Sequence, residues 1–190
     1  MKSQENPKPI YLKDYRPPEF FIPEVKLHFD LHDEFTRVTS KLSLTRNTAI
    51  ESTGTLALNG EGLKPLRVAI DGRELKANEY EVTSTHLIIP NVPDRFELEV
   101  ETRIEPHKNL SCEGLYKSSG MFCTQCEAES FRKITYFLDR PDVMSVYTVT
   151  IEADKAKYPI LLSNGNSISK RDLGNGRHEA VWHDPFKKIG

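Results

Sequence analysis

The stretch Val25-Lys26-Leu27-His28-Phe29-Asp30-Leu31 decides the fold, because apolar and polar side chains alternate in it without a break. An alternation with a period of two places all the apolar side chains on one face of an extended chain, so it predicts a half-buried β-strand. A second alternating segment, 35–46, follows the turn residues His32, Asp33 and Glu34. The two segments together predict a long hairpin.

Shorter segments of the same kind recur along the rest of the chain. Several end at turn signals such as Asn59-Gly60 and Asp71-Gly72, and the second dipeptide is preferred in type I′ hairpin turns. Only the segment 129–138 departs from this pattern, since its apolar residues recur at helical spacing and Pro141 follows as a stop. The whole pattern predicts an all-β fold, a sandwich or saddle of mostly antiparallel strands with one short helix near 129–138.

The domain organisation follows from length and composition. A chain of 190 residues can bury one sizeable core. The first part, 1–22, is rich in proline and charge, and we expect it to form an N-terminal arm laid over the surface. No internal repeat or low-complexity segment interrupts 23–190, so this range is predicted to be a single β domain.

Charge and hydropathy exclude some partners. Acidic and basic residues are nearly balanced, at 28 and 26, which argues against a surface for nucleic acid or for an anionic membrane. No window reaches the roughly 18 apolar residues of a membrane span, and the first nine residues contain no apolar stretch of signal-peptide length. Three cysteines cannot form a closed disulfide framework, so we expect free thiols in a reducing compartment. The predicted location is the cytoplasm.

The candidate site lies in Cys123-Thr124-Gln125-Cys126-Glu127-Ala128-Glu129, where acidic and amide side chains are concentrated. Gln125 and Glu127 occupy alternate positions of an extended segment, so both side chains should project to the same side. An amide and a carboxylate that face one way can accept hydrogen bonds from an ammonium group. A loop carboxylate is more often simply solvated, and the residues alone leave both interpretations open.

Charged residues follow this segment and suggest how it is held. Arg132, Asp139, Arg140 and Asp142 are expected to form ion pairs that attach the loop to the sheet, and no chemistry is assigned to them.

The pair Cys123-x-x-Cys126 admits three interpretations: half of a zinc site, a redox motif, or two reduced thiols beside a functional loop. A zinc site would need a second C-x-x-C or a pair of histidines, and a thioredoxin-like motif would need a βαβ context. Only His28 and His32 have the spacing i, i+4, and in a strand they would lie roughly 13 Å apart. We therefore predict that the chain itself binds no metal and favour reduced thiols.

Further motifs are collinear with the candidate site, namely Leu58-Asn59-Gly60-Glu61-Gly62-Leu63-Lys64, Glu113-Gly114-Leu115-Tyr116 and Tyr158-Pro159-Ile160-Leu161-Leu162-Ser163-Asn164-Gly165-Asn166. With these motifs the chain, from about Tyr15 to Phe186, resembles the N-terminal domain of the zinc aminopeptidase N family, closest to its bacterial cytosolic branch. The resemblance implies a parent enzyme that removes N-terminal residues from peptides and holds zinc through an H-E-x-x-H helix. That motif is absent from this sequence. The chain is therefore predicted to be one non-catalytic domain of a larger enzyme, inactive alone.

The same resemblance implies roles for the site residues. Glu127 would bind the amino terminus of the substrate beside a second Glu from the catalytic domain, and Gln125 would line the first side-chain pocket. The peptide bond between Glu127 and Ala128 would be cis. The implied partners are peptides with a free N-terminus and the catalytic domain of the same polypeptide, and zinc is the implied cofactor of the parent enzyme.

Two other classes of function stay open on the sequence. A free-standing β-sandwich interaction module would be favoured if the reading frame ended at Gly190 and excluded if it continued into G-x-M-E-N and H-E-x-x-H stretches. A small cysteine-based metal or redox protein would show stoichiometric zinc or a reversible thiol couple.

Overall fold

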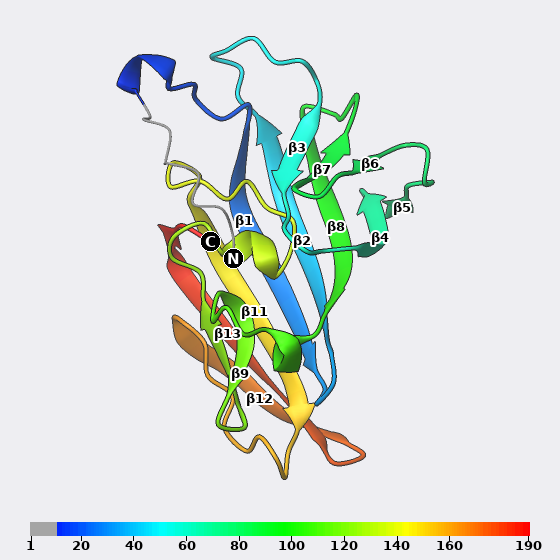
Figure 1. Cartoon of the computed structure of the whole chain (residues 1–190), viewed down its shortest axis with the longest axis vertical. Helices are drawn as coiled ribbons and strands as arrows, with labels where there is room; N and C mark the ends of the chain where they lie inside the picture. The colour runs from blue at the N-terminus through cyan, green and yellow to red at the C-terminus, as the bar shows by residue number, and fades with distance from the viewer. Residues whose placement is uncertain (1–10) are drawn as a thin grey trace.

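The computed structural model describes residues 11–190, which form an all-β molecule (Figure 1). Within this range the helical parts are single turns of 3-10 helix, η1 (Leu12–Asp14), η2 (Pro106–Lys108) and η3 (Phe131–Lys133). In the same range, no helix is long and apolar enough to cross a membrane. The strands are β1 (Phe20–Leu31), β2 (Thr36–Arg46), β3 (Leu56–Asn59), β4 (Pro65–Ile70), β5 (Arg73–Glu74), β6 (Glu81–Val82), β7 (His86–Ile89), β8 (Arg95–Ile104), β9 (Gly114–Ser118), β10 (Met121–Gln125), β11 (Ser145–Asp154), β12 (Asn166–Gly174) and β13 (Arg177–Lys188).

One large sheet organises the fold, with the strand order β12-β13-β11-β1-β2-β8-β4-β5. Its neighbouring strands are antiparallel except for β1 and β11, which run parallel. A sheet of three strands, β3-β7-β6, and the β9–β10 hairpin complete the molecule. Figure 1 shows β3, β6 and β7 toward one end of the long sheet and β9 toward the other. The prediction of an all-β fold with mostly antiparallel strands is confirmed.

The alternating stretch in β1 behaves as predicted. Val25, Leu27, Phe29 and Leu31 are all buried and belong to the main hydrophobic core, whereas the residues between them are exposed or half-buried. Their apolar side chains supply the hydrophobic driving force for the hairpin with β2, because each buried side chain of this size contributes about 1.5–3 kcal/mol relative to full exposure.

The first strand begins earlier than the sequence pattern suggested. Phe20 and Ile22 are 1% and 0% exposed, so β1 takes in the last three residues of the predicted arm. Pro23 interrupts the alternation, and the register with β2 shifts between Phe21 and Glu24. A proline has no N–H to donate to a ladder, and a bulge accommodates it within a strand that continues. Of the predicted arm 1–22, residues 1–10 lie outside the described part of the chain.

The helix predicted near 129–138 is reduced to the single turn η3 (Phe131–Lys133). Its apolar residues Phe131, Ile134 and Phe137 are buried, so the pattern identified core positions correctly. The backbone of Phe137, however, forms an isolated antiparallel bridge with Asn59, with hydrogen bonds in both directions at 2.8 and 3.1 Å. A backbone that bonds to a strand distant in sequence cannot continue a helix, because a residue has only one N–H to donate.

Candidate functional site

The β9–β10 hairpin carries the two predicted site residues. Gln125 is the last residue of β10, and Glu127 follows two residues later in a turn. Opposite Gln125 in the ladder lies Gly114, whose φ is +72°. A Cβ atom at this glycine would lie 2.9 Å from the Cβ atom of Lys133. Glycine at this position therefore permits both the left-handed backbone and the close approach of the hairpin to η3.

Gln125 and Glu127 line the same cavity, which has a volume of about 390 Å³. Both residues are exposed, and the side-chain amide of Gln125 donates to the backbone carbonyl of Glu127 at 2.9 Å. The peptide bond between Glu127 and Ala128 is cis, as the family resemblance implied. The structure thus brings the two predicted residues together at one cavity.

The charges at this cavity differ in how they are paired. Asp184 forms an ion pair with Lys188, which holds the pKa of the Asp184 carboxyl below its usual range. For Glu127, by contrast, the described residues 11–190 offer no ion pair or hydrogen bond to the carboxylate. A carboxylate without such a partner is available for a cationic ligand.

The other walls of the cavity come from segments that the sequence pattern did not single out as a site. They include apolar positions of β1 and β11 and polar positions of β13 and of the loop before β12. A partial signal existed, since Ser163 and Asn164 lie in a motif that carries the family resemblance. The residues from these segments are Leu27, Phe29, Tyr147, Val149, Ser163, Asn164, Asp184 and Lys188.

The loop after Glu127 is held by a buried ion pair. Asp139 is only 6% exposed, and its carboxylate accepts hydrogen bonds from the backbone N–H of Arg132 at 3.1 Å and from its Nε at 2.9 Å. Nη2 of Arg132 also donates to the backbone carbonyl of Asp139 at 2.6 Å. Arg140 and Asp142 form a second pair, with Nη2 and Oδ2 2.6 Å apart. The four residues form ion pairs as expected, but both pairs join residues within the segment 132–142, so neither attaches the loop to the sheet as predicted.

The cysteines are free thiols. Cys126 lines the cavity, and burial raises the pKa of its thiol to about 11. Cys123 lies in β10, and Cys112 is exposed. A thiol with a raised pKa is a poor nucleophile and a poor metal ligand at neutral pH, since the thiolate is the reactive form.

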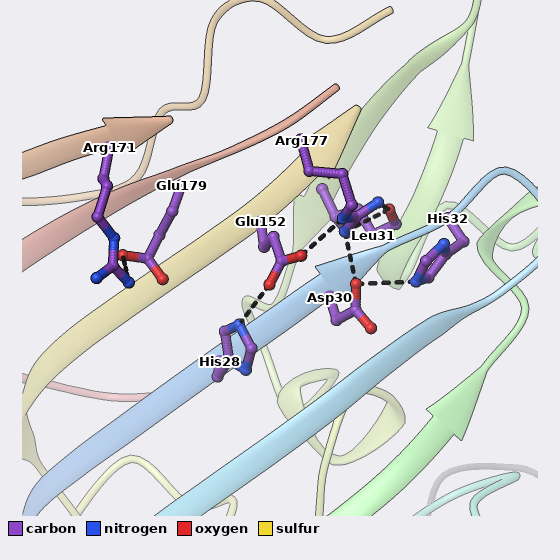
Figure 2. A network of polar contacts seen from close by, with 8 residues as sticks. All are labelled: His28, Asp30, Leu31, His32, Glu152, Arg171, Arg177 and Glu179. Carbon is purple, nitrogen blue, oxygen red and sulfur yellow. Dashed lines mark hydrogen bonds and ion pairs between the residues drawn. The ribbon is translucent and has the colours of Figure 1, made fainter. Parts of the chain in front are cut away.

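Two of the histidines, His28 and His32, lie beside carboxylates. His28 Nε2 lies 3.6 Å from Glu152 Oε2, and His32 Nε2 lies 2.9 Å from Asp30 Oδ1 (Figure 2). Between residues 11 and 190 no group of three or more His, Cys, Asp or Glu side chains is placed to hold a metal ion. The described residues therefore offer no ligand set for the zinc ion that the family resemblance implies, and no chemical step is assigned to zinc here.

Fold and site together define an all-β domain that presents a carboxylate without an ion pair at a cavity. The chain belongs to the peptidase M1 N-terminal domain family, whose model matches residues 18–188.

Individual relatives agree with this assignment. The chain is 52% identical to aminopeptidase N of Caulobacter vibrioides over 97% of its own length and 46% identical to aminopeptidase N of Escherichia coli over the same share. These matches cover 21% of each relative, so the chain spans about a fifth of the length of the curated relatives.

Solved structures share the fold. The crystal structure of Legionella pneumophila aminopeptidase A in complex with aspartic acid matches with a TM-score of 0.88 and 33% identity, over 94% of this chain and 21% of that one. An M1 zinc metallopeptidase from Deinococcus radiodurans has the same fold, with a TM-score of 0.75 at 12% identity, over 90% of this chain and 40% of that one.

Proposed function

We propose that this chain is the N-terminal domain of a zinc-dependent aminopeptidase that removes N-terminal residues from peptides. In this proposal the domain caps the active-site cleft, and its partner is the catalytic domain of the same polypeptide, which supplies the zinc ligands. Membership of the M1 family and the relatives named aminopeptidase N support it. The free cysteines agree with a cytoplasmic location, and the net charge of −2 argues against nucleic acid and anionic membranes as partners.

The observation that carries the proposal is the unpaired carboxylate of Glu127 beside Gln125 at the cavity. An exopeptidase that trims N-termini needs an acceptor for the free α-amino group, because this group distinguishes its substrate from an internal peptide bond. A charge-assisted hydrogen bond to an ammonium group contributes about 1.5–3 kcal/mol. Glu127 is proposed to be this acceptor, and Gln125 to line the pocket for the first side chain.

Substitution of Glu127 tests the assignment in the full-length enzyme that contains this domain. Glu127→Ala should lower kcat/KM for peptides with a free amino terminus by roughly ten- to a hundredfold, because the ammonium group loses its acceptor. The matched control is Glu129→Ala, which removes an exposed carboxylate of the same turn that is already paired with Arg132. An unchanged kcat/KM in a folded Glu127→Ala enzyme would refute the assignment.

A second measurement tests whether hydrolysis requires the catalytic domain. The 190-residue chain, incubated with aminoacyl chromogenic substrates and added zinc, should give no turnover, because it contains no H-E-x-x-H motif. Chelator-sensitive hydrolysis by the pure chain would contradict this expectation.

A further inference from the structure

The β9–β10 hairpin, which ends at Gln125, is attached near its tip to the turn between β1 and β2. In that turn Asp33 Oδ1 accepts a hydrogen bond from the hydroxyl of Tyr158 at 2.8 Å and from Nζ of Lys117 at 3.3 Å. Lys157 Nζ contacts the other oxygen, Oδ2. Since Lys117 lies in β9 and the other two donors follow β11, one carboxylate joins three segments that are distant in sequence.

Aromatic contacts extend this group to β10. The ring centroids of Phe122 and Tyr158 lie 5.1 Å apart, and Nζ of Lys117 lies 4.6 Å and 5.5 Å from them. A cation at this distance is attracted by the negative face of an aromatic ring. We call these residues the Asp33 clamp: Asp33, Lys117, Phe122, Lys157 and Tyr158.

The clamp is more than an isolated surface ion pair, which alone would contribute little. Hydrogen bonds from Lys157, Tyr158 and Lys117 hold the pKa of the Asp33 carboxyl well below its usual range, so this group stays ionised at neutral and mildly acidic pH. The side chain of Lys117 is only 18% exposed. Partial removal from water reduces the screening of its charge.

The end of β1, which leads into the turn that carries Asp33, is anchored by Arg177 (Figure 2). Arg177, the first residue of β13, donates to Asp30 Oδ1 and to Glu152 Oε1, both at 2.6 Å. Its guanidinium also reaches the backbone carbonyl of Leu31 at 3.4 Å. The arginine thereby links the end of β1 to β11 and β13. The turn that carries Asp33 therefore extends from three strands of the large sheet that are bonded to one another.

Within the part of the chain that the structure describes, β9 and β10 form strand pairs only with each other, while Leu115 of β9 is buried in the main core and Phe122 of β10 packs against it. At the end near the site, Asn109 Nδ2 donates to the backbone carbonyls of Glu113 at 2.7 Å and Leu115 at 2.9 Å. A two-stranded hairpin is only marginally stable by itself. Its direction therefore depends on its attachments to the rest of the domain, which are the segment around Gly114, the core contact of Leu115 and the clamp.

We propose that the Asp33 clamp is a positioning element of the candidate site, which holds the hairpin in the direction that places Gln125 and Glu127 at the cavity. Asp33 and Lys117 are positioning residues in this sense, since they act on the substrate through the hairpin without touching it. The proposal rests on the proposed function, in which Glu127 receives the substrate amine.

The test uses the full-length enzyme that contains this domain. Asp33→Asn keeps the shape of the side chain and removes its charge, and we expect KM for a peptide with a free amino terminus to rise about three- to tenfold while kcat changes less. The matched control is Asp172→Asn, because Asp172 is also an exposed carboxylate that pairs with a lysine, Lys155, but it lies in β12. The control should leave KM unchanged.

A double-mutant cycle separates positioning from a general loss of stability. If Asp33 acts through Glu127, Asp33→Asn should cause little further loss of kcat/KM in an enzyme that already carries Glu127→Ala. Losses by the same factor in both backgrounds would overturn the proposal, and so would an unchanged KM in the single Asp33→Asn enzyme.

Hydrogen exchange tests the clamp without reference to the substrate. Amides of 114–125 in the full-length enzyme should exchange faster in Asp33→Asn than in the wild type or in Asp172→Asn, because opening of the hairpin no longer breaks the clamp. Unchanged exchange would overturn the proposal whatever the effect of Glu127→Ala. An unchanged kcat/KM in Glu127→Ala alone would count against the proposed function instead, so the two failures are distinguishable.

Discussion

Asp139→Ala is expected to destabilise the domain by about 3 kcal/mol, at the lower end of the range for a broken buried ion pair. The substitution leaves the guanidinium of Arg132, whose side chain is 21% exposed, without its main partner. It also removes two hydrogen bonds that the carboxylate accepts. For a domain of this size the melting temperature should fall by roughly 6–12 °C, which thermal unfolding followed by circular dichroism would measure.

The control for this experiment is Asp172→Ala. It also removes a carboxylate that pairs with a basic side chain, but the Asp172 side chain is 56% exposed whereas that of Asp139 is 6% exposed. An exposed pair contributes at most about 1 kcal/mol, so this variant should melt near the wild type. Equal losses in the two variants would show that the buried pair does not hold the loop.

Gly165→Ala is expected to destabilise the domain by about 2–5 kcal/mol, since a left-handed backbone penalty adds to a steric clash. Gly165 has a φ of +84°, and a Cβ atom there would lie 2.3 Å from the backbone oxygen of His183 and 2.7 Å from Cα of Asp184. Backbone atoms in a paired strand cannot move aside as a flexible side chain would. Any shift of the backbone of His183 and Asp184 that relieved this clash would also alter the cavity, because Asp184 is part of its wall.

Gly174→Ala is the matched control for this prediction. Gly174 has a similar φ of +76°, but nothing lies within 4 Å of the Cβ position. This variant should therefore lose only the backbone penalty of about 1–2 kcal/mol. Chemical denaturation of both variants measures the difference, and a loss in Gly165→Ala no greater than in Gly174→Ala would contradict the clash.

The site was predictable in part. Gln125 and Glu127 are two residues apart and both line one cavity, although Glu127 lies in the turn after β10 and not in the extended segment that the sequence predicted. Asp184 and Tyr147 could not be predicted as part of that cavity, because they reach it only through the pairing of β11 with β13. The Asp33 clamp could not be predicted either, since Lys117 and Lys157 lie 84 and 124 positions after Asp33 in the sequence.

The sequence by itself determined the alternating strands such as β1 and β2 and the faces they bury, because the alternation of side chains is a local property that any extended backbone converts into one apolar face. It also contained the motifs of the family and the pair Gln125 and Glu127. Tertiary structure decided which strands are neighbours, including the parallel pairing of β1 with β11. It also decided that the segment 129–138 forms only one helical turn. The bridge between Asn59 and Phe137 uses the backbone N–H and C=O of Phe137, which a longer helix would need. These outcomes depend on contacts between distant segments, and such contacts form only when the whole core is assembled.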